Sequence, residues 1–254
     1  MARPLVQFVI GGVQKAGTTA LAHYLGRLPG VVLPSSKEAH VFDDPRFDAT
    51  WDAARIEAEY AAYFPPRDEF AMHGDATPIY LYHPAFVQRL AGYNPRMKWI
   101  ILLRDPVDRA ISQFYMQRSR GEEALPLWAA LLAEPFRLLR DRDDFSVKSS
   151  MRRHSYVSRG RYRHQLSVLF QHFPQEQVLV LKSADLLAHP SACMERVCLH
   201  LGLPAPAAGT AYPPVFQGNY PQGADHRLVR WAVRLLFRNE IDWLNGTDPD
   251  HRLG

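Results

Sequence analysis

The sequence predicts an α/β protein in which one doubly wound parallel sheet is flanked by helices, all within a single domain of residues 1–254. Three apolar runs, at residues 6–10, 97–103 and 177–181, are each long enough for a strand that is buried on both faces. Segments with helical spacing lie between these runs. Because parallel strands need a long crossover, usually a helix, this alternation favours a parallel sheet.

Local signals define the remaining elements in order. Pro65 and Pro66 end one helix, whereas Asp105 fits the residue before another helix and Pro106 its first residue. Two shorter strands fit residues 31–33 and 70–74. The expected helices span residues 16–28, 51–64, 84–91, 125–140, 162–173 and 190–201, and two more begin at Pro106 and Asp225.

The composition sets limits on the class of protein. Hydrophobic residues make up 47% and charged residues 22% of the chain, which is typical of a soluble globular protein, and a net charge of +4 says little about partners. Two cysteines and eleven histidines without paired spacing predict neither a disulfide scaffold nor a metal site. No charged-then-apolar leader and no run near ~18 apolar residues is present, so we expect a cytoplasmic chain without a transmembrane segment. The oligomeric state stays open.

The loop after the first strand favours an anion. Gly11 and Gly12 are expected to end the strand and turn tightly, and residues 16–19 (AGTT) open the next helix. Backbone N–H groups and the positive end of the helix dipole then point to a spot that suits phosphate or sulfate. The GxxxxG spacing from Gly12 is close to a Walker A loop, but Thr18 replaces its lysine. Lys15 approaches from the loop instead; the alternative is a glycine-rich turn with a solvated lysine.

A second candidate loop, residues 34–43, follows the short strand at residues 31–33. The carboxyl ends of parallel strands face the ligand crevice of such sheets, so Lys37, Glu38 and His40 are expected near Lys15. Glu38 is a candidate general base, and His40 is its candidate partner or a group that orients the acceptor. The alternative is a solvated loop of mixed charge.

A third candidate site lies where the run 97–103 meets the next helix. Arg104 ends the strand, and Ser112 lies two turns into the helix. A fixed guanidinium with a hydroxyl suits a second phosphate. The alternative is an Arg104 paired with Asp105 or Asp108.

Two further segments have an open role. Residues 145–166 carry six basic residues and no acidic one, which suits an anionic ligand; a disordered loop and a face shielded by acids are the alternatives. Residues 213–221 form an aromatic, glycine-containing loop that is either a lid or a surface loop.

The last expected helix has an apolar face and an arginine stripe. We expect its apolar face to be buried and its stripe to be solvated, with a contact to a polyanion or lipid as the alternative. The apolar face comprises Leu228, Val229, Ala232, Leu235 and Leu236, and the stripe comprises Arg227, Arg230, Arg234 and Arg238.

Taken together, these segments resemble sulfotransferases that use 3′-phosphoadenosine 5′-phosphosulfate (PAPS), in a soluble, bacterial-type form of the heparan-sulfate-sulfotransferase-like branch. GGVQKAGTTAL resembles the family's 5′-phosphosulfate loop, KEAHVFD its catalytic-base segment, and KWIILLRDPVDRAISQFY its 3′-phosphate segment. The segments GRYRHQLSVLFQHFP, QVLVLKSADLLAHP and FRNEIDWLNG resemble its later landmarks. The resemblance extends over nearly the whole chain.

This resemblance implies a P-loop-NTPase-like fold and a set of roles. Lys15 would contact the sulfonate and the bridging oxygen, Glu38 would accept the proton of the acceptor hydroxyl, and His40 would assist near the acceptor. No metal is needed, and the product is adenosine 3′,5′-bisphosphate. The cofactor-binding residues would be Lys15, Ala16, Gly17, Thr18 and Thr19 at the 5′ end, Arg104 and Ser112 at the 3′-phosphate, and Arg159 and Gly218 in addition.

Two departures from the family pattern are visible. Residues 75–78 read Asp-Ala-Thr-Pro where the family often has Glu-Lys-Thr-Pro, and residues 217–220 lack the family's lysine, a charge that Arg159 or Arg161 is expected to replace. The acceptor is expected to be a glycan or a small molecule, and no nucleic acid is expected. The rival interpretations are a P-loop nucleotide kinase or ATPase and a nucleic-acid-binding protein.

Overall fold

A computed structural model describes residues 5–66, 68, 70–142, 144–213, 215 and 224–246. The chain divides into two compact units. The sheet unit comprises residues 1–103, 165–216 and 254, and the helical unit comprises residues 104–164 and 217–253. The expectation of one domain over residues 1–254 stays a prediction.

The sheet unit is built on five parallel strands in the order β2-β3-β1-β4-β5. Chain crossings run from β1 outward to β2 and from β3 over β1 to β4, so the sheet is doubly wound as predicted. The central strands β1 and β4 are almost wholly buried, which explains their apolar sequences. The strands are β1 (Val6–Gly12), β2 (Val31–Val32), β3 (Met72–Asp75), β4 (Lys98–Leu103) and β5 (Val178–Lys182).

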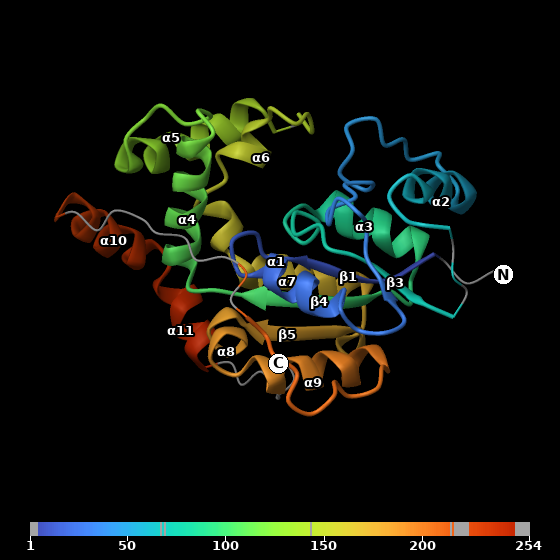
Figure 1. Ribbon diagram of the computed structural model, residues 1–254. Coiled ribbons are helices and arrows are strands. Elements are labelled where there is room, and N and C mark those ends of the chain that lie inside the picture. The colour runs from blue at the N-terminus through green and yellow to red at the C-terminus, as the bar shows by residue number, and fades with distance from the viewer. Residues whose placement is uncertain are drawn as a thin grey trace. The chain divides into compact units, whose positions relative to one another are not determined.

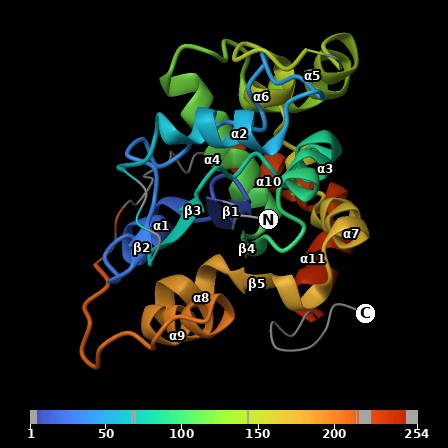
Figure 2. The same ribbon diagram turned by 90° about the vertical axis from the view of Figure 1, so that its right-hand side faces the viewer.

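Helices cover both faces of this sheet. Figures 1 and 2 show α1, α8 and α9 on one face and α3 and α7 on the other. Trp99 of β4 packs against Phe173 just after α7, with 5.4 Å between the ring centroids. The helical elements are α1 (Thr18–Leu25), α2 (Ala53–Ala61), α3 (Pro84–Tyr93), α7 (Tyr162–His172, in this unit from Gln165), η2 (Gln175–Gln177), α8 (Ser183–Ala188) and α9 (Pro190–Leu201).

Gly11 and Gly12 do not turn the chain, which corrects one expectation. Both residues belong to β1 and are buried. A β-carbon on Gly11 would overlap the Trp99 ring, and one on Gly12 would lie 2.9 Å from the Leu81 side chain. Glycine is therefore needed for close packing at these positions, and the turn begins only at Val13.

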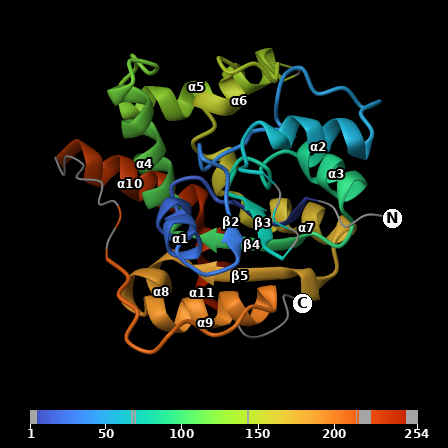
Figure 3. The same cartoon turned by 45° about the vertical axis from the view of Figure 1, so that its right-hand side comes forward.

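The helical unit is arranged around α4 (Pro106–Ser119), which contacts both α5 (Leu127–Arg140) and α10 (Ala224–Leu236) (Figure 3). As predicted, Asp105 caps α4, because its Oδ1 accepts hydrogen bonds from the Val107 and Asp108 N–H groups. The apolar core of the unit contains Val107, Ala110, Ile111, Phe114, Leu127, Ala130, Tyr156, Val233, Phe237 and Ile241. The remaining elements are α6 (Ser150–Arg153), η1 (Ser158–Gly160) and α11 (Arg238–Gly246).

Two buried carboxylates of the helical unit hold its loops. Glu134 of α5, 2% exposed, accepts hydrogen bonds from the Val157 and Ser158 N–H groups at 2.6 and 2.7 Å. Glu123 pairs with Arg137 at 2.5 Å and accepts a hydrogen bond from Tyr156. Both contacts link α5 to segments distant in the sequence.

The expected buried face of the last helix is wrong except at Val229, which packs against the core. Val233 of α10 and Phe237 just after it enter the core, whereas Leu228, Leu235 and Leu236 are more than half exposed. The helical periodicity was correct, but the apolar arc of α10 is wider than the part that the core covers. None of the described helices is long and apolar enough to cross a membrane.

Candidate active site

The loop between β1 and α1 presents a helix start together with Lys15. The Val13 N–H donates to the Leu102 carbonyl at 2.9 Å, which ties the loop to β4. Lys15 has a left-handed φ of 74°, and Gly17, with φ 96°, precedes α1 without a side-chain cap. An uncapped helix start is a typical anion site. A left-handed lysine costs on the order of 1–2 kcal/mol, so the surrounding packing must impose this conformation.

The predicted anion-binding residues differ in exposure. Gly17 and Thr19 are exposed and Lys15 is half-buried, whereas Ala16 and Thr18 are buried. Backbone N–H groups at positions 17–19 and the Lys15 ammonium therefore remain the groups that an anion would meet. Their role in binding stays a prediction.

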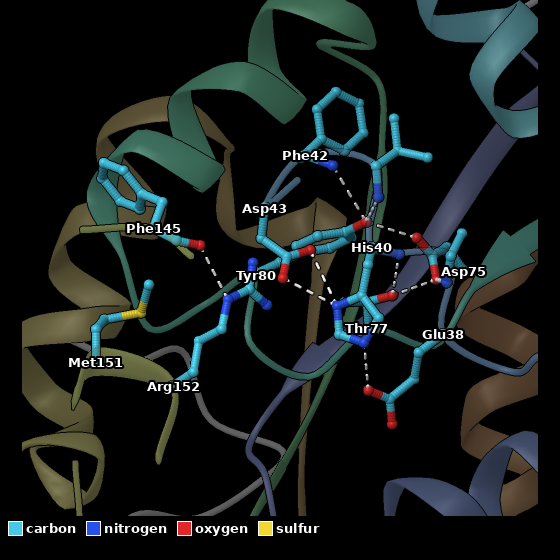
Figure 4. Close-up of polar contacts among 12 residues, drawn as sticks. Glu38, His40, Phe42, Asp43, Asp75, Thr77, Tyr80, Phe145, Met151 and Arg152 are labelled. Atoms are coloured by element: carbon cyan, nitrogen blue, oxygen red, sulfur yellow. Dashed lines mark hydrogen bonds and ion pairs between the residues drawn. The ribbon is translucent and has the colours of Figure 1, made fainter. Parts of the chain in front are cut away.

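The loop between β2 and α2 links Lys37, Glu38, His40 and Asp43 in a series of ion pairs, and Figure 4 shows the contacts of His40 with Glu38 and Asp43. Glu38 lies 2.5 Å from the Lys37 Nζ and 3.2 Å from the His40 Nε2. The His40 Nδ1 lies 2.9 Å from the Asp43 Oδ2. His40 is thus held between two carboxylates, one of which, Asp43, is fully buried. Lys37 and His40 both have left-handed φ values, 70° and 55°, so strain flanks Glu38 on each side.

The neighbouring charges in this loop shift the pKa values of Glu38 and His40 in opposite directions. Burial by itself raises the pKa of Glu38, but hydrogen bonds and charges from His40 and Lys37 outweigh it and lower that pKa to about 2. Burial likewise lowers the pKa of His40, but its bonds to Asp43 and Glu38 outweigh this and raise the pKa to about 10. At neutral pH, Glu38 is therefore ionised and His40 is an imidazolium.

Asp75, at the end of β3, binds the backbone of the second loop (Figure 4). Its Oδ1 accepts the Ala39 N–H at 3.3 Å and the Thr77 hydroxyl at 2.6 Å. Its Oδ2 accepts the hydroxyls of Tyr60 at 3.0 Å and Tyr80 at 2.8 Å. Burial raises the pKa of Asp75, and these four donors oppose that rise.

Two of these four donors, both hydroxyls, also accept hydrogen bonds from the backbone of the loop. The Tyr80 hydroxyl accepts the Val41 N–H at 3.1 Å, and the Thr77 hydroxyl accepts the His40 N–H at 3.4 Å. Asp75 thus fixes the conformation that carries His40, directly and through two hydroxyls. Sequence reasoning gave no role to Asp75 or Asp43; the available signal was a carboxylate ending a strand before Thr-Pro, and another placed three residues after His40.

The segment after β3 also lies between the two loops. The Ala76 N–H donates to the Lys37 carbonyl at 3.4 Å, and the Leu81 N–H donates to the Gly11 carbonyl at 3.0 Å. Because β3 lies between β2 and β1, both loops leave the same edge of the sheet with this segment bridging them. Lys15 and Glu38 are therefore carried by one edge of one unit.

Arg104 and Ser112 belong to the helical unit. Arg104 follows β4 directly, and its carbonyl accepts the Tyr162 hydroxyl at 2.8 Å. Ser112 lies on the buried face of α4 at 1% exposure. Lys15 belongs to the sheet unit, so the expectation that it and Arg104 hold one nucleotide stays a prediction.

The basic stretch at residues 145–166 is not a uniform positive surface. Arg159 is 3% exposed and donates to Ser155 at 2.6 Å and to the Met151 carbonyl at 2.8 Å. Arg152 donates to the Phe145 carbonyl, and Arg153 pairs with Glu122. Such internal contacts engage at least three of the six basic side chains. A cofactor contact of Arg159 stays a prediction that these bonds do not support.

The other predicted positions have simple outcomes. Gly218 and most of the 213–221 loop lie outside the described residues. Among the residues that the structure does describe, no group of three or more histidine, cysteine or acidic side chains is placed to hold a metal ion.

Comparison with known proteins identifies the family. The family model of the sulfotransferase domain matches residues 6–211. The chain belongs to the sulfotransferase domain family. This confirms the family and enzyme class expected from the motifs and favours them over a kinase or a nucleic-acid-binding protein.

Relatives and solved structures agree with this assignment. A sulfotransferase from Alicyclobacillus acidocaldarius has 26% sequence identity to this chain, and the match covers 98% of each of the two chains. The two structures superpose with a TM-score of 0.73, which confirms the predicted fold. The mouse heparan sulfate glucosamine 3-O-sulfotransferase 3A1 is 28% identical over 79% of this chain and 47% of its own length. The membrane-associated sulfotransferase kil1 of Dictyostelium discoideum is 34% identical over 44% of this chain and 23% of its own length. The chain thus spans less than half the length of these curated relatives.

Proposed function

We propose that this chain transfers a sulfo group from PAPS to the hydroxyl of an acceptor. The observation that carries this proposal is the shared sheet edge: an uncapped helix start with Lys15 follows β1, and the loop with the Glu38 carboxylate follows β2, with only β3 between these two strands. Sulfuryl transfer requires a cation at the leaving phosphate and a base at the acceptor, and these two loops offer one of each.

The residues present fit the donor. The N–H groups at Gly17, Thr18 and Thr19 suit the 5′-phosphate, and the half-buried Lys15 ammonium suits the sulfonate and the bridging oxygen. Arg104 and Ser112 are proposed to hold the 3′-phosphate. The donor, when bound, supplies an activated sulfo group. Lys15 then stabilises the negative charge that collects on the leaving phosphate oxygen.

Glu38 is the proposed base. The acceptor oxygen bonds to sulfur while the bond from sulfur to the phosphate oxygen breaks, and the acceptor proton passes to a Glu38 oxygen. A carboxyl with a pKa near 2 accepts a proton poorly. We therefore propose that the acceptor takes the place of the Lys37 ammonium at Glu38, which raises that pKa. His40, held by Asp43, keeps the other Glu38 oxygen in place.

The test uses Glu38→Gln with Glu59→Gln as its matched control. Glu59 lies on α2 in the same unit and pairs only with surface arginines in the contacts described. Incubation with labelled PAPS and a panel of glycan, phenol and alcohol acceptors is scored by a mass gain of one sulfo group. We expect E38Q to lower turnover by about 10²–10⁴-fold, E59Q to leave it unchanged, and both to bind adenosine 3′,5′-bisphosphate equally.

Calorimetry separates this function from phosphoryl transfer. A sulfotransferase binds adenosine 3′,5′-bisphosphate without added metal, whereas a kinase binds ATP with magnesium. Tighter binding of magnesium-ATP, or unchanged turnover in E38Q, would contradict the proposal. The heparan sulfate relative acts on a glycan by its name, so glycans are the first acceptor class to test.

A further inference from the structure

We propose that α10 docks the protein on the surface of an anionic lipid bilayer. The α10 outer face, defined as Leu228, Trp231, Leu235 and Leu236, consists of large apolar side chains that are 56–72% exposed. Together the three leucines and the tryptophan present an apolar patch on the order of a few hundred Å². The largest apolar patch on a monomer is of this order, and such patches are often functional.

The core does not need this face. Val233 in α10 and Phe237 after it pack in the apolar core of the helical unit, and Val229 packs partly against it. At about 100° per residue, these three lie on one side of the helix, and the α10 outer face continues around to the other side. The helix is therefore held by one face while a second apolar face is presented outward.

Arginines border that outward face. Arg227, Arg230 and Arg234 form one stripe of α10 along the Trp231 edge, and no acidic residue interrupts residues 227–236, whereas Arg238 begins α11 and lies 3.9 Å from Asp242. Arg230 pairs with Asp108 at 2.6 Å, whereas Arg227 and Arg234 are exposed. Leucines and a tryptophan beside arginines are the pattern of helices that lie in the plane of a bilayer interface, with apolar side chains below the headgroups and guanidinium groups at the phosphates.

Charge complementarity favours an anionic bilayer as the partner of this face over a second copy of the chain and over a polyanion. In a twofold pairing of two copies through α10, each arginine stripe would face the same patch of its partner, and the α10 sequence offers a single acidic residue, Asp225, to balance it. A nucleic acid or acidic glycan would satisfy the arginines but would leave the leucines in water. An anionic bilayer meets both requirements.

The chain supplies a matched control on α5. This helix exposes a comparable stripe of Trp128, Leu132, Phe136 and Leu139. Its nearby arginines are engaged, because Arg137 pairs with Glu123 and Arg140 pairs with Asp141. Apolar exposure alone therefore predicts that both stripes bind lipid, whereas our proposal predicts that only α10 does.

Vesicle co-sedimentation of the full chain tests the proposal. We expect binding to vesicles containing one-third phosphatidylserine, weak binding to pure phosphatidylcholine, and loss of binding in high salt. The double variant W231A/L235A is expected to lower the partition coefficient at least tenfold, each of R227Q and R234Q about fivefold, and W128A not at all. The exposed positions of these side chains predict unchanged thermal stability.

Several outcomes would overturn the proposal. They are equal binding to both vesicle types, unchanged binding of W231A/L235A, or an equal loss in W128A. Light scattering decides the case of a second copy: a dimer that W231A/L235A converts to a monomer would assign the α10 outer face to self-association. Binding of RNA or heparin that the arginine variants abolish, without vesicle binding, would assign the stripe to a polyanion.

Discussion

Replacing Tyr80 by Phe removes one hydroxyl that links Asp75 to the candidate catalytic loop. The hydroxyl donates to the Asp75 Oδ2 at 2.8 Å and accepts the Val41 N–H at 3.1 Å, and the side chain is fully buried. A hydrogen bond to a charged group contributes about 1.5–3 kcal/mol, and a buried N–H left without its acceptor costs a further 1–3 kcal/mol. We expect Y80F to lower the free energy of unfolding by about 3 kcal/mol.

Tyr60→Phe is the matched control for this change. The Tyr60 hydroxyl donates to the same Asp75 oxygen at 3.0 Å and is equally buried, but no contact described for it involves the 39–42 backbone. Y60F should therefore cost only about 1.5 kcal/mol. Urea unfolding followed by circular dichroism gives both values, and hydrogen exchange at the Val41 amide reports the loop directly. Equal destabilisation by the two variants, with Val41 exchange unchanged in Y80F, would refute the reasoning.

Three further changes test other parts of the sheet unit. Gly17→Ala places a β-carbon on a residue with φ 96°, which should cost ~1 kcal/mol of stability and weaken adenosine 3′,5′-bisphosphate binding in calorimetry. Gly30→Ala is its control, because Gly30 has φ 75° and no atom lies within 4 Å of the new carbon. It should cost a similar ~1 kcal/mol of stability without affecting binding. His40 has a pKa of about 10 in the fold against about 6.5 unfolded, so the stability it contributes is complete below pH 6.5 and is lost as pH rises through 10. Its side chain is 45% exposed, so this loss should be only about 1 kcal/mol, and urea titrations at pH 7 and pH 10 should show it in the native chain but not in H40N. Gly74→Ala would drive a β-carbon into the Phe8 ring and should cost about 2 kcal/mol of stability, read as a lower thermal midpoint.

The sheet was predictable because its strongest signals are local. Runs such as 97–103 are apolar enough to require burial on both faces, and the Asp105-Pro106 pair starts α4 where local capping places it. The short strand β2 was predicted at residues 31–33 and has two residues, because its pairing with β3 covers only Val31 and Val32.

The candidate site was predictable in its loops but not in its supports. Lys15 and Glu38 stand out because they follow strand ends, a property that the sequence displays. The role of Asp75 depends on hydrogen bonds from Tyr60 and Tyr80, which form only in the folded chain. The spacing of these residues in the sequence does not predict the contact. The prediction of the buried face of α10 failed at its leucines for a related reason. Periodicity gives the apolar arc of the helix, but only packing decides which part of that arc is covered.

The two hydrogen bonds that Glu134 accepts have a mechanical consequence. This buried carboxylate of α5 accepts hydrogen bonds from the N–H groups of Val157 and Ser158, so we expect a displacement of α5 to carry the start of η1 with it. A ligand or antibody that tilts α5 by its outer stripe would drag the backbone ahead of Arg159 with it. A molecule bound to the exposed side of α5 is therefore expected to shift the 157–160 turn without contacting it.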